Sequence, residues 1–215
     1  MQRAILAPQN TEVQDINSAI LQIFKGEERA YHSIDRVQDD HDGTHEVEDN
    51  YYPTEFLNSI NIGGLPPSKL ELKPGVPLML LRNLDPANGL CNGTRMRLLN
   101  STYRVLQVKI LTGTEAGRAA FIPRITLESN KGELEFLLKC RQFPVRLAFA
   151  MTINKSQGQS LGTVGLCLTI PVFSHGQFYV GVSRGTNWNR VKILLSEEAH
   201  GKTSNVVYPE VILKS

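Results

Sequence analysis

The chain has 215 residues with a formal net charge of +2, and 41% of its residues are hydrophobic and 20% charged. This length suffices for one sizeable core, or for one domain with a smaller insert, and the composition is that of a globular protein rather than a disordered one. No apolar run reaches the roughly 18 residues of a membrane span, and the first ten residues lack the pattern of a secretory signal. We therefore expect an intracellular protein with no membrane partner.

The small net charge conceals an uneven distribution. Residues 1–55 contain 4 Lys and Arg against 12 Asp and Glu, whereas residues 56–215 contain 19 against 9. Half of the acidic residues of the first part lie in 38–50, a polar stretch that predicts a surface loop. A basic body indicates a polyanion partner, but a solvated charged surface explains the same count equally well.

Three cysteines, Cys91, Cys140 and Cys167, lie far apart and form no CxxC pair. Odd in number and flanked by apolar residues, they are typical of reduced thiols that pack as small hydrophobic side chains. We predict neither a disulfide nor a zinc site.

The first elements follow an α/β pattern. Residues 3–8 read as a short buried strand, and apolar residues at helical spacing predict a helix directly after it. A strand followed by a helix is typical of an α/β unit. Residues 30–37 suggest another strand, and 54–60 a short helix.

From residue 72 the pattern changes to short β segments separated by Gly, Asn and Pro turns, and from residue 147 the α/β pattern returns. We predict an α/β fold, a parallel sheet flanked by helices, interrupted by a small antiparallel β-barrel. The expected parts are 1–72 and 146–215 for the sheet domain, with 73–145 as the insert.

Complete catalytic motifs are missing from the sequence. "GKT" at 201–203 follows a predicted strand, but a phosphate loop needs glycine where Ser196 stands, and 204–215 read as a strand rather than the required helix. The acidic residues and histidines of 39–49 lack strand support for a metal site, so a solvated loop explains them better. No HExxH or GxSxG pattern is present.

Two polar stretches exceed what a fold needs: "MTINKSQGQSL" at 151–161 and "FYVGVSRGTN" at 178–187. Each follows an apolar element, so we expect both at the sheet edge where the loops of parallel sheets bind ligands. Arg184 reads equally well as a cation that stabilises a helix C-terminus or as a guanidinium directed at a phosphate.

Four ordered segments carry a family resemblance. They are "RAILAPQNTEVQDINSAIL" at 3–21, "LKPGVPLMLLRNLDPANGLCNGTRMRL" at 72–98, "FAMTINKSQGQSL" at 149–161 and "FYVGVSRGTN" at 178–187. Together they resemble the C-terminal half of the Pif (petite integration frequency) DNA helicases. That family is RecD-like, belongs to superfamily 1B and includes the helicase part of Helitron transposons.

The resemblance implies an ATP-dependent, five-prime to three-prime DNA helicase that uses ATP and Mg and binds single-stranded DNA. ATP would lie between two RecA-like domains, of which this chain resembles the second, with an SH3-like β-barrel insert. The N-terminal RecA-like domain with the phosphate loop would be a required partner, and this fragment alone would be inactive. The resemblance also implies a nuclear or mitochondrial location if the source is eukaryotic. The alternative is a stand-alone nucleic-acid-binding or regulatory module descended from such a helicase.

The family motifs assign roles residue by residue. Thr152, Asn154 and Lys155 would contact DNA, although many relatives have histidine at the position of Asn154. The residues that contact the nucleotide would be Gln157, Gly158 and Arg3. Arg184 would be the arginine finger, the catalytic residue that stabilises charge on the transferring phosphoryl group.

In the insert, "GLCNGTRMRLL" places Asn92, Arg95 and Arg97 on a turn and strand. The resemblance implies that they contact DNA. A tight turn with solvated arginines explains each of them equally well.

Overall fold

The computed structural model describes residues 3–38, 52–60 and 62–212, and these divide into two compact units. Unit 1 comprises residues 1–23 and 148–215, and unit 2 comprises 24–147. Most of the acidic stretch predicted as a loop at 38–50 lies outside the described residues.

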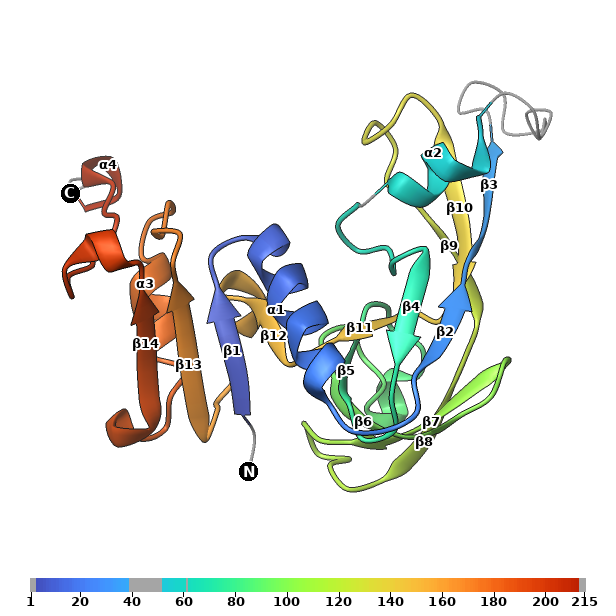
Figure 1. Ribbon diagram of the computed structural model, residues 1–215, viewed down its shortest axis with the longest axis horizontal. Coiled ribbons are helices and arrows are strands. Elements are labelled where there is room, and N and C mark those ends of the chain that lie inside the picture. The colour runs from blue at the N-terminus through green and yellow to red at the C-terminus, as the bar shows by residue number, and fades with distance from the viewer. Residues whose placement is uncertain (1–2, 39–51, 61, 213–215) are drawn as a thin grey trace. The chain divides into compact units, whose positions relative to one another are not determined.

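Unit 1 is built on a parallel sheet with the strand order β12-β1-β13-β14 (Figure 1). Its strands are β1 (Arg3–Ala7), β12 (Ala150–Thr152), β13 (Thr163–Leu168) and β14 (Val191–Leu195). Strand β1 pairs with both β12 and β13, with Ala7 beside Thr152 and Arg3 beside Thr163. The predicted parallel sheet is confirmed, and its apolar residues form the core of the unit, including Leu6, Leu166 and Leu168.

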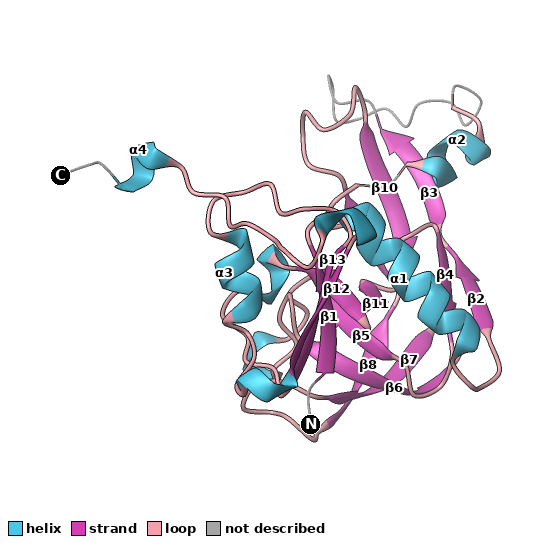
Figure 2. Ribbon diagram, turned by 60° about the vertical axis from the view of Figure 1, so that its left-hand side comes forward, coloured by secondary structure: helices cyan, strands magenta, loops and turns pink. Residues whose placement is uncertain are grey.

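Helix α1 (Asn10–Ile23) covers one face of this sheet, and α3 (Gln177–Val182) lies on the other (Figure 2). Asn17 on α1 is buried, and its side-chain amide exchanges hydrogen bonds of 3.1 and 2.9 Å with the backbone of Ala150. A buried amide of this kind is satisfied on both sides, so it holds α1 at one position along β12.

The last part of unit 1 differs from the expected strand. Within residues 204–212, Val206 forms an isolated parallel bridge with His175. The residues after it form a short helix, α4 (Pro209–Ile212). Pro209 explains the difference, because proline is well tolerated in the first turn of a helix and cannot donate to a sheet ladder.

Unit 2 contains a five-stranded antiparallel sheet with the order β11-β5-β6-β7-β8. The strands are β5 (Pro77–Leu80), β6 (Arg95–Ser101), β7 (Val105–Ile110), β8 (Ala119–Pro123) and β11 (Val145–Leu147). These strands contribute fully buried residues, among them Leu78, Met96, Leu106 and Ile122, and along β7 the buried residues alternate with more exposed ones. The period of two is that of a sheet with one face on a core.

Two further sheets complete unit 2. A three-stranded antiparallel sheet has the order β3-β10-β9, and a two-stranded one joins β2 to β4. Their strands are β2 (Arg29–His32), β3 (Ile34–Gln38), β4 (Lys69–Leu72), β9 (Ile125–Glu128) and β10 (Leu137–Gln142), and the short helix α2 (Thr54–Ser59) lies between β3 and β4 in sequence. Residues 24–72 therefore pair within unit 2, whereas the sequence analysis grouped them with the parallel sheet.

Arg146 ties the segment between α2 and β4 to this unit. Its guanidinium donates to the carbonyl oxygens of Ile62 and Leu65 at 3.0 Å each. Burial lowers the pKa of Arg146 from its usual value, yet arginine remains charged at neutral pH. Charge-assisted bonds to backbone carbonyls are the compensation that such a buried guanidinium needs.

No helix in the described residues is long and apolar enough to cross a membrane.

The reactivity of the Cys140 thiol tests whether the three-stranded sheet is packed as described. Its side chain is buried on β10, and burial together with nearby Asp35 raises the pKa of the thiol to about 12. Because the thiolate is the reactive form, we predict that Cys140 does not react with Ellman's reagent at pH 8 until denaturant unfolds unit 2. In the folded state, the Cys140→Ser variant should release the same amount of the Ellman reaction product as the unmodified chain. A native Cys140 that reacts as fast as the partly exposed Cys91 would contradict this prediction.

Candidate functional site

The polar segment 152–161 begins at the carboxyl end of β12 with a tight turn. Thr152 is buried, and its hydroxyl accepts a 3.4 Å hydrogen bond from the backbone N–H of Lys155. Ser156 is also buried and donates from Oγ to the carbonyl of Ile153 at 2.6 Å. Asn154 and Lys155, between them, are exposed on a single 3-10 turn. Thr152 and Ser156 therefore hold the turn, and Asn154 and Lys155 project from it.

Gly158 makes the next change of chain direction. Its φ is +78°, a conformation that side chains with a Cβ rarely adopt, and no described heavy atom lies within 4 Å of where a Cβ would stand. The glycine is thus required by backbone conformation, and the space beside it is open. Its exposed neighbour Gln157 shares this open surface.

The segment ends in a backbone connection to the second predicted motif. Leu161 N–H donates to the carbonyl of Arg184 at 2.8 Å, and Thr186 N–H donates back to Leu161 at 3.0 Å. Leu161 and Gly185 thereby form a parallel bridge. A Cβ on Gly185 would lie 2.5 Å from Cγ2 of Val191, so only glycine fits this position without displacement.

Arg184 is half-buried just after α3, and its guanidinium is fixed by its own unit. Nε donates to the carbonyl of Val180 at 3.0 Å, Nη1 to the carbonyl of Gln159 at 3.3 Å and Nη2 to Oγ of Ser183 at 2.9 Å. A guanidinium has five N–H groups, so these bonds leave donors on both terminal nitrogens for an anion.

The segment connects the two edges of the parallel sheet. Thr152 lies at the carboxyl edge, beside Ala7 at the end of β1. Gly185, by contrast, bridges to Leu161 just before β13 and β14 begin, which places Arg184 at the amino edge. The expectation that both polar stretches lie at one ligand-binding edge is wrong, because α3 carries the chain back across the sheet before Arg184.

Arg3 starts β1 beside Thr163 and is exposed, so it shares the amino edge with Arg184. The structure thus separates the predicted residues into Thr152, Asn154 and Lys155 at one edge and Arg3 and Arg184 at the other.

The predicted residues of the insert lie in unit 2 and differ in exposure. Asn92 and Arg97 are exposed, whereas Arg95 is 3% exposed and burial lowers the pKa of its guanidinium. The backbone of Arg95 is also covered, since its N–H donates to Thr112 Oγ1 at 3.0 Å and its carbonyl accepts from Leu111 at 2.8 Å. Only Asn92 and Arg97 reach the surface as expected.

Gln159 is a site residue that the sequence analysis left unassigned. Its carbonyl accepts from Arg184, its Nε2 donates to the carbonyl of Lys155 at 3.3 Å, and its Oε1 is buried. It therefore contacts both ends of the candidate site. The repeated Gln-x-Gln spacing in "SQGQS" was the available signal. In the described residues, no three His, Cys, Asp or Glu side chains gather as a metal site.

Sequence comparisons relate this chain to helicases. Residues 55–100 match the family model "DNA helicase Pif1, 2B domain". The chain is 37% identical over 129 residues to the human ATP-dependent DNA helicase PIF1, covering 58% of this chain and 19% of the relative. It is 28% identical over 196 residues to the Xenopus laevis enzyme of the same name, covering 88% and 27%. The chain thus spans about a fifth to a quarter of these curated relatives.

Comparison with solved structures shows the fold. The Candida albicans Pif1 helicase matches 99% of this chain with 48% of its own, at a TM-score of 0.71 and 22% identity. The Bacteroides Pif1 helicase in complex with ADP-AlF3 and ssDNA matches 98% with 43% of its own chain, at a TM-score of 0.67 and 22% identity. The fold is therefore that of a RecA-like α/β protein, as predicted. In sequence and in fold this chain is therefore similar to Pif1 DNA helicases, which confirms the predicted resemblance.

Gly158 provides a test of the turn geometry. We predict that Gly158→Ala lowers the melting temperature by about 2 to 4 °C, since a left-handed conformation costs an ordinary side chain about 1 kcal/mol or more. Gly158→Asn should cost less, because asparagine tolerates this conformation better. Differential scanning calorimetry of the two variants measures the difference, and equal melting temperatures for Ala and Gly at this position would disprove the turn.

Proposed function

We propose that this chain forms the C-terminal motor half of an ATP-dependent DNA helicase of five-prime to three-prime polarity. In this proposal it binds single-stranded DNA and completes an ATP site together with an N-terminal RecA-like domain that carries the phosphate loop. One observation supports it most directly. The polar segment has exposed donors at one sheet edge, and at the other its backbone is bonded to the arginine motif.

The DNA contact is proposed for the first turn of the segment. Asn154 and Lys155 are exposed and can donate to backbone phosphates, which position nucleic acid without reading its sequence. The buried hydroxyl of Thr152 supports the proposed contact by fixing the backbone of Lys155. In unit 2, Arg97 and Asn92 are proposed as further contacts.

The nucleotide contact is proposed for the opposite edge. The free N–H groups of Arg184 suit the negative oxygens of a terminal phosphate, and the open surface at Gly158 and Gln157 admits a close approach. Arg3, at the same edge, is proposed as a second cation for phosphate. ATP would supply the phosphoryl group, and the Mg that accompanies it would be held by carboxylates of the phosphate-loop domain.

In this proposal, Gln159 couples the nucleotide contact to the DNA contact. Its carbonyl touches Arg184 and its side chain touches the backbone of Lys155, so movement at the nucleotide edge is transmitted to the DNA turn through one residue. Domain closure on ATP would then alter the grip on DNA, which is the coupling that a translocating motor requires.

Joining this chain to the phosphate-loop domain of a Pif1 relative tests the catalytic role. We expect the chimera to hydrolyse ATP in response to single-stranded DNA, and Arg184→Ala to lower kcat by about 10³-fold or more. Arg184→Lys should recover only part of the rate because lysine lacks the planar fork of donors. Arg190→Ala, an arginine shortly before β14, is the matched control and should leave kcat nearly unchanged.

If the chimera binds DNA without hydrolysing ATP, the stand-alone binding module replaces the motor as the interpretation. If the chimera hydrolyses ATP and Arg184→Ala matches the unmodified rate, the finger assignment is wrong.

The DNA turn has a separate test in the chain alone. We predict that Lys155→Gln lowers the affinity for oligo(dT) a few-fold at low salt and reduces the slope of log affinity against log salt by about 0.7, the effect of one lost phosphate contact. Lys192→Gln, an exposed lysine on β14, removes the same charge and should change the slope little. Fluorescence anisotropy across a salt series measures both, and equal slopes for the two variants would contradict the contact.

A further inference from the structure

A hollow lined by aromatic rings lies in unit 2, where the start of α2 meets the connection between β9 and β10 (Figure 1). Its volume is about 460 Å³, within the roughly 300 to 1,000 Å³ of ligand pockets. The lining residues, which we call the aromatic hollow, are Tyr52, Phe56, Gly132, Glu133, Leu134, Glu135 and Phe136. None of them belongs to the DNA or nucleotide contacts proposed above, so the hollow calls for a separate explanation.

Three rings from two distant segments meet in the hollow. The rings of Tyr52 and Phe56 are stacked, with centroids 5.8 Å apart and planes inclined by 22°. The ring of Phe136 lies 4.4 Å from that of Tyr52 and 6.5 Å from that of Phe56. Each ring carries partial negative charge on its faces. Three such rings at one opening therefore form a surface that attracts a cation.

Core packing explains two of these rings but not the third. Phe136 is buried in the apolar cluster of unit 2, and Tyr52 packs against that cluster. Phe56, by contrast, is 45% exposed. Its neighbour Leu57 is the α2 residue buried in the cluster, so α2 is already held in place without Phe56. A large ring left at the surface of a hollow is typical of a residue that contacts a ligand.

The hollow has a negative charge although the chain as a whole is positive. Glu133 and Glu135 line it, both are exposed, and no lining residue is a cation. Oε2 of Glu133 accepts a 3.3 Å hydrogen bond from the backbone N–H of Asn130. Glu135 has no hydrogen bond or ion pair among the residues that the structure describes. Carboxylates beside aromatic faces favour a ligand that is both cationic and able to donate hydrogen bonds.

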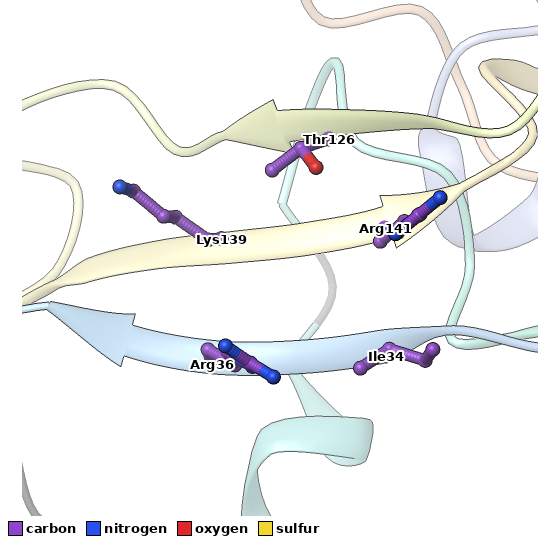
Figure 3. Close-up of a pocket in the computed structure, with 5 residues that line it drawn as sticks. All are labelled: Ile34, Arg36, Thr126, Lys139 and Arg141. Carbon is purple, nitrogen blue, oxygen red and sulfur yellow. The ribbon is translucent and has the colours of Figure 1, made fainter. Parts of the chain in front are cut away.

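A second hollow of unit 2 has the opposite character (Figure 3). Three of its five lining residues are cations, and it contains no aromatic ring; they are Ile34, Arg36, Thr126, Lys139 and Arg141. One ligand cannot suit both surfaces. A cationic ligand that binds to the aromatic hollow is repelled by this second hollow, so its binding distinguishes the two.

We propose that the aromatic hollow binds an arginine side chain from a basic segment of another protein. A planar guanidinium stacks on an aromatic face while its fork of N–H groups donates to a carboxylate. The methylene stem of the arginine packs against the half-buried Leu134. An apolar side chain would desolvate Glu133 and Glu135 without giving them a partner. A lysine ammonium is more strongly hydrated and cannot stack, so it fits less well.

Peptide binding to the whole chain, without DNA or nucleotide, tests the proposal. We expect a fluorescein-labelled peptide of alternating arginine and glycine to bind at 50 mM salt, as measured by fluorescence anisotropy. The same peptide with citrulline, which keeps the shape and loses the charge, should bind about tenfold more weakly or less. A lysine peptide should bind a few-fold more weakly. Absence of arginine-peptide binding, or equal binding of citrulline, would overturn the proposal, and equal binding of lysine would overturn the arginine assignment.

Replacing the exposed ring separates stacking from apolar contact. Phe56→Leu keeps an apolar side chain and should lower the affinity for the arginine peptide about fivefold, whereas Phe56→Tyr should preserve it. Phe121→Leu is the matched control, because Phe121 is an exposed ring of β8 in the same unit and does not line the hollow. Equal affinities of Phe56→Leu and Phe121→Leu would remove the aromatic hollow as the binding site. Thermal melting of each variant shows that the fold is retained.

Replacing the carboxylates leaves every ring in place and serves as a second test should Phe56→Leu fail to fold. E133Q/E135Q should lower the affinity about threefold at 50 mM salt and little at 500 mM, because exposed charges are screened. The loss caused by Phe56→Leu should persist at high salt. E197Q/E198Q, an exposed acidic pair in unit 1, removes the same charge and should have no effect. General attraction to the acidic sequence at 39–49 would survive both E133Q/E135Q and Phe56→Leu, and that result would overturn the hollow.

Discussion

The central position of β1 in the parallel sheet is the constraint on which the rest of the structure depends. Residues 3–7 pair on one side with 150–152 and on the other with 163–168, so strands from the two ends of the chain form a single core. Everything between residues 24 and 147 must therefore leave this sheet and return to it. The buried Asn17 reinforces the constraint, because its amide is satisfied only when α1 lies against Ala150.

The same topology explains how the candidate site is divided. In a parallel sheet each connection must carry the chain from the carboxyl edge back to the amino edge before the next strand begins. The polar segment is such a connection between β12 and β13, and α3 with Arg184 is the connection between β13 and β14. Both run the same way, so their ends meet at the amino edge, where Leu161 and Gly185 pair. Contact between the two motifs follows from strand order.

Local sequence patterns predicted those elements whose signals lie within one segment. The spacing of apolar residues identified β1 and α1, and the turn residues identified the change to antiparallel strands at residue 72. Pairing between distant segments leaves no such local signal. The sequence analysis therefore grouped residues 24–72 with the parallel sheet, whereas they belong to unit 2. Arg95 and Arg97 show the same limit, since alternation places both on one face of β6, yet Arg95 is buried and Arg97 is exposed.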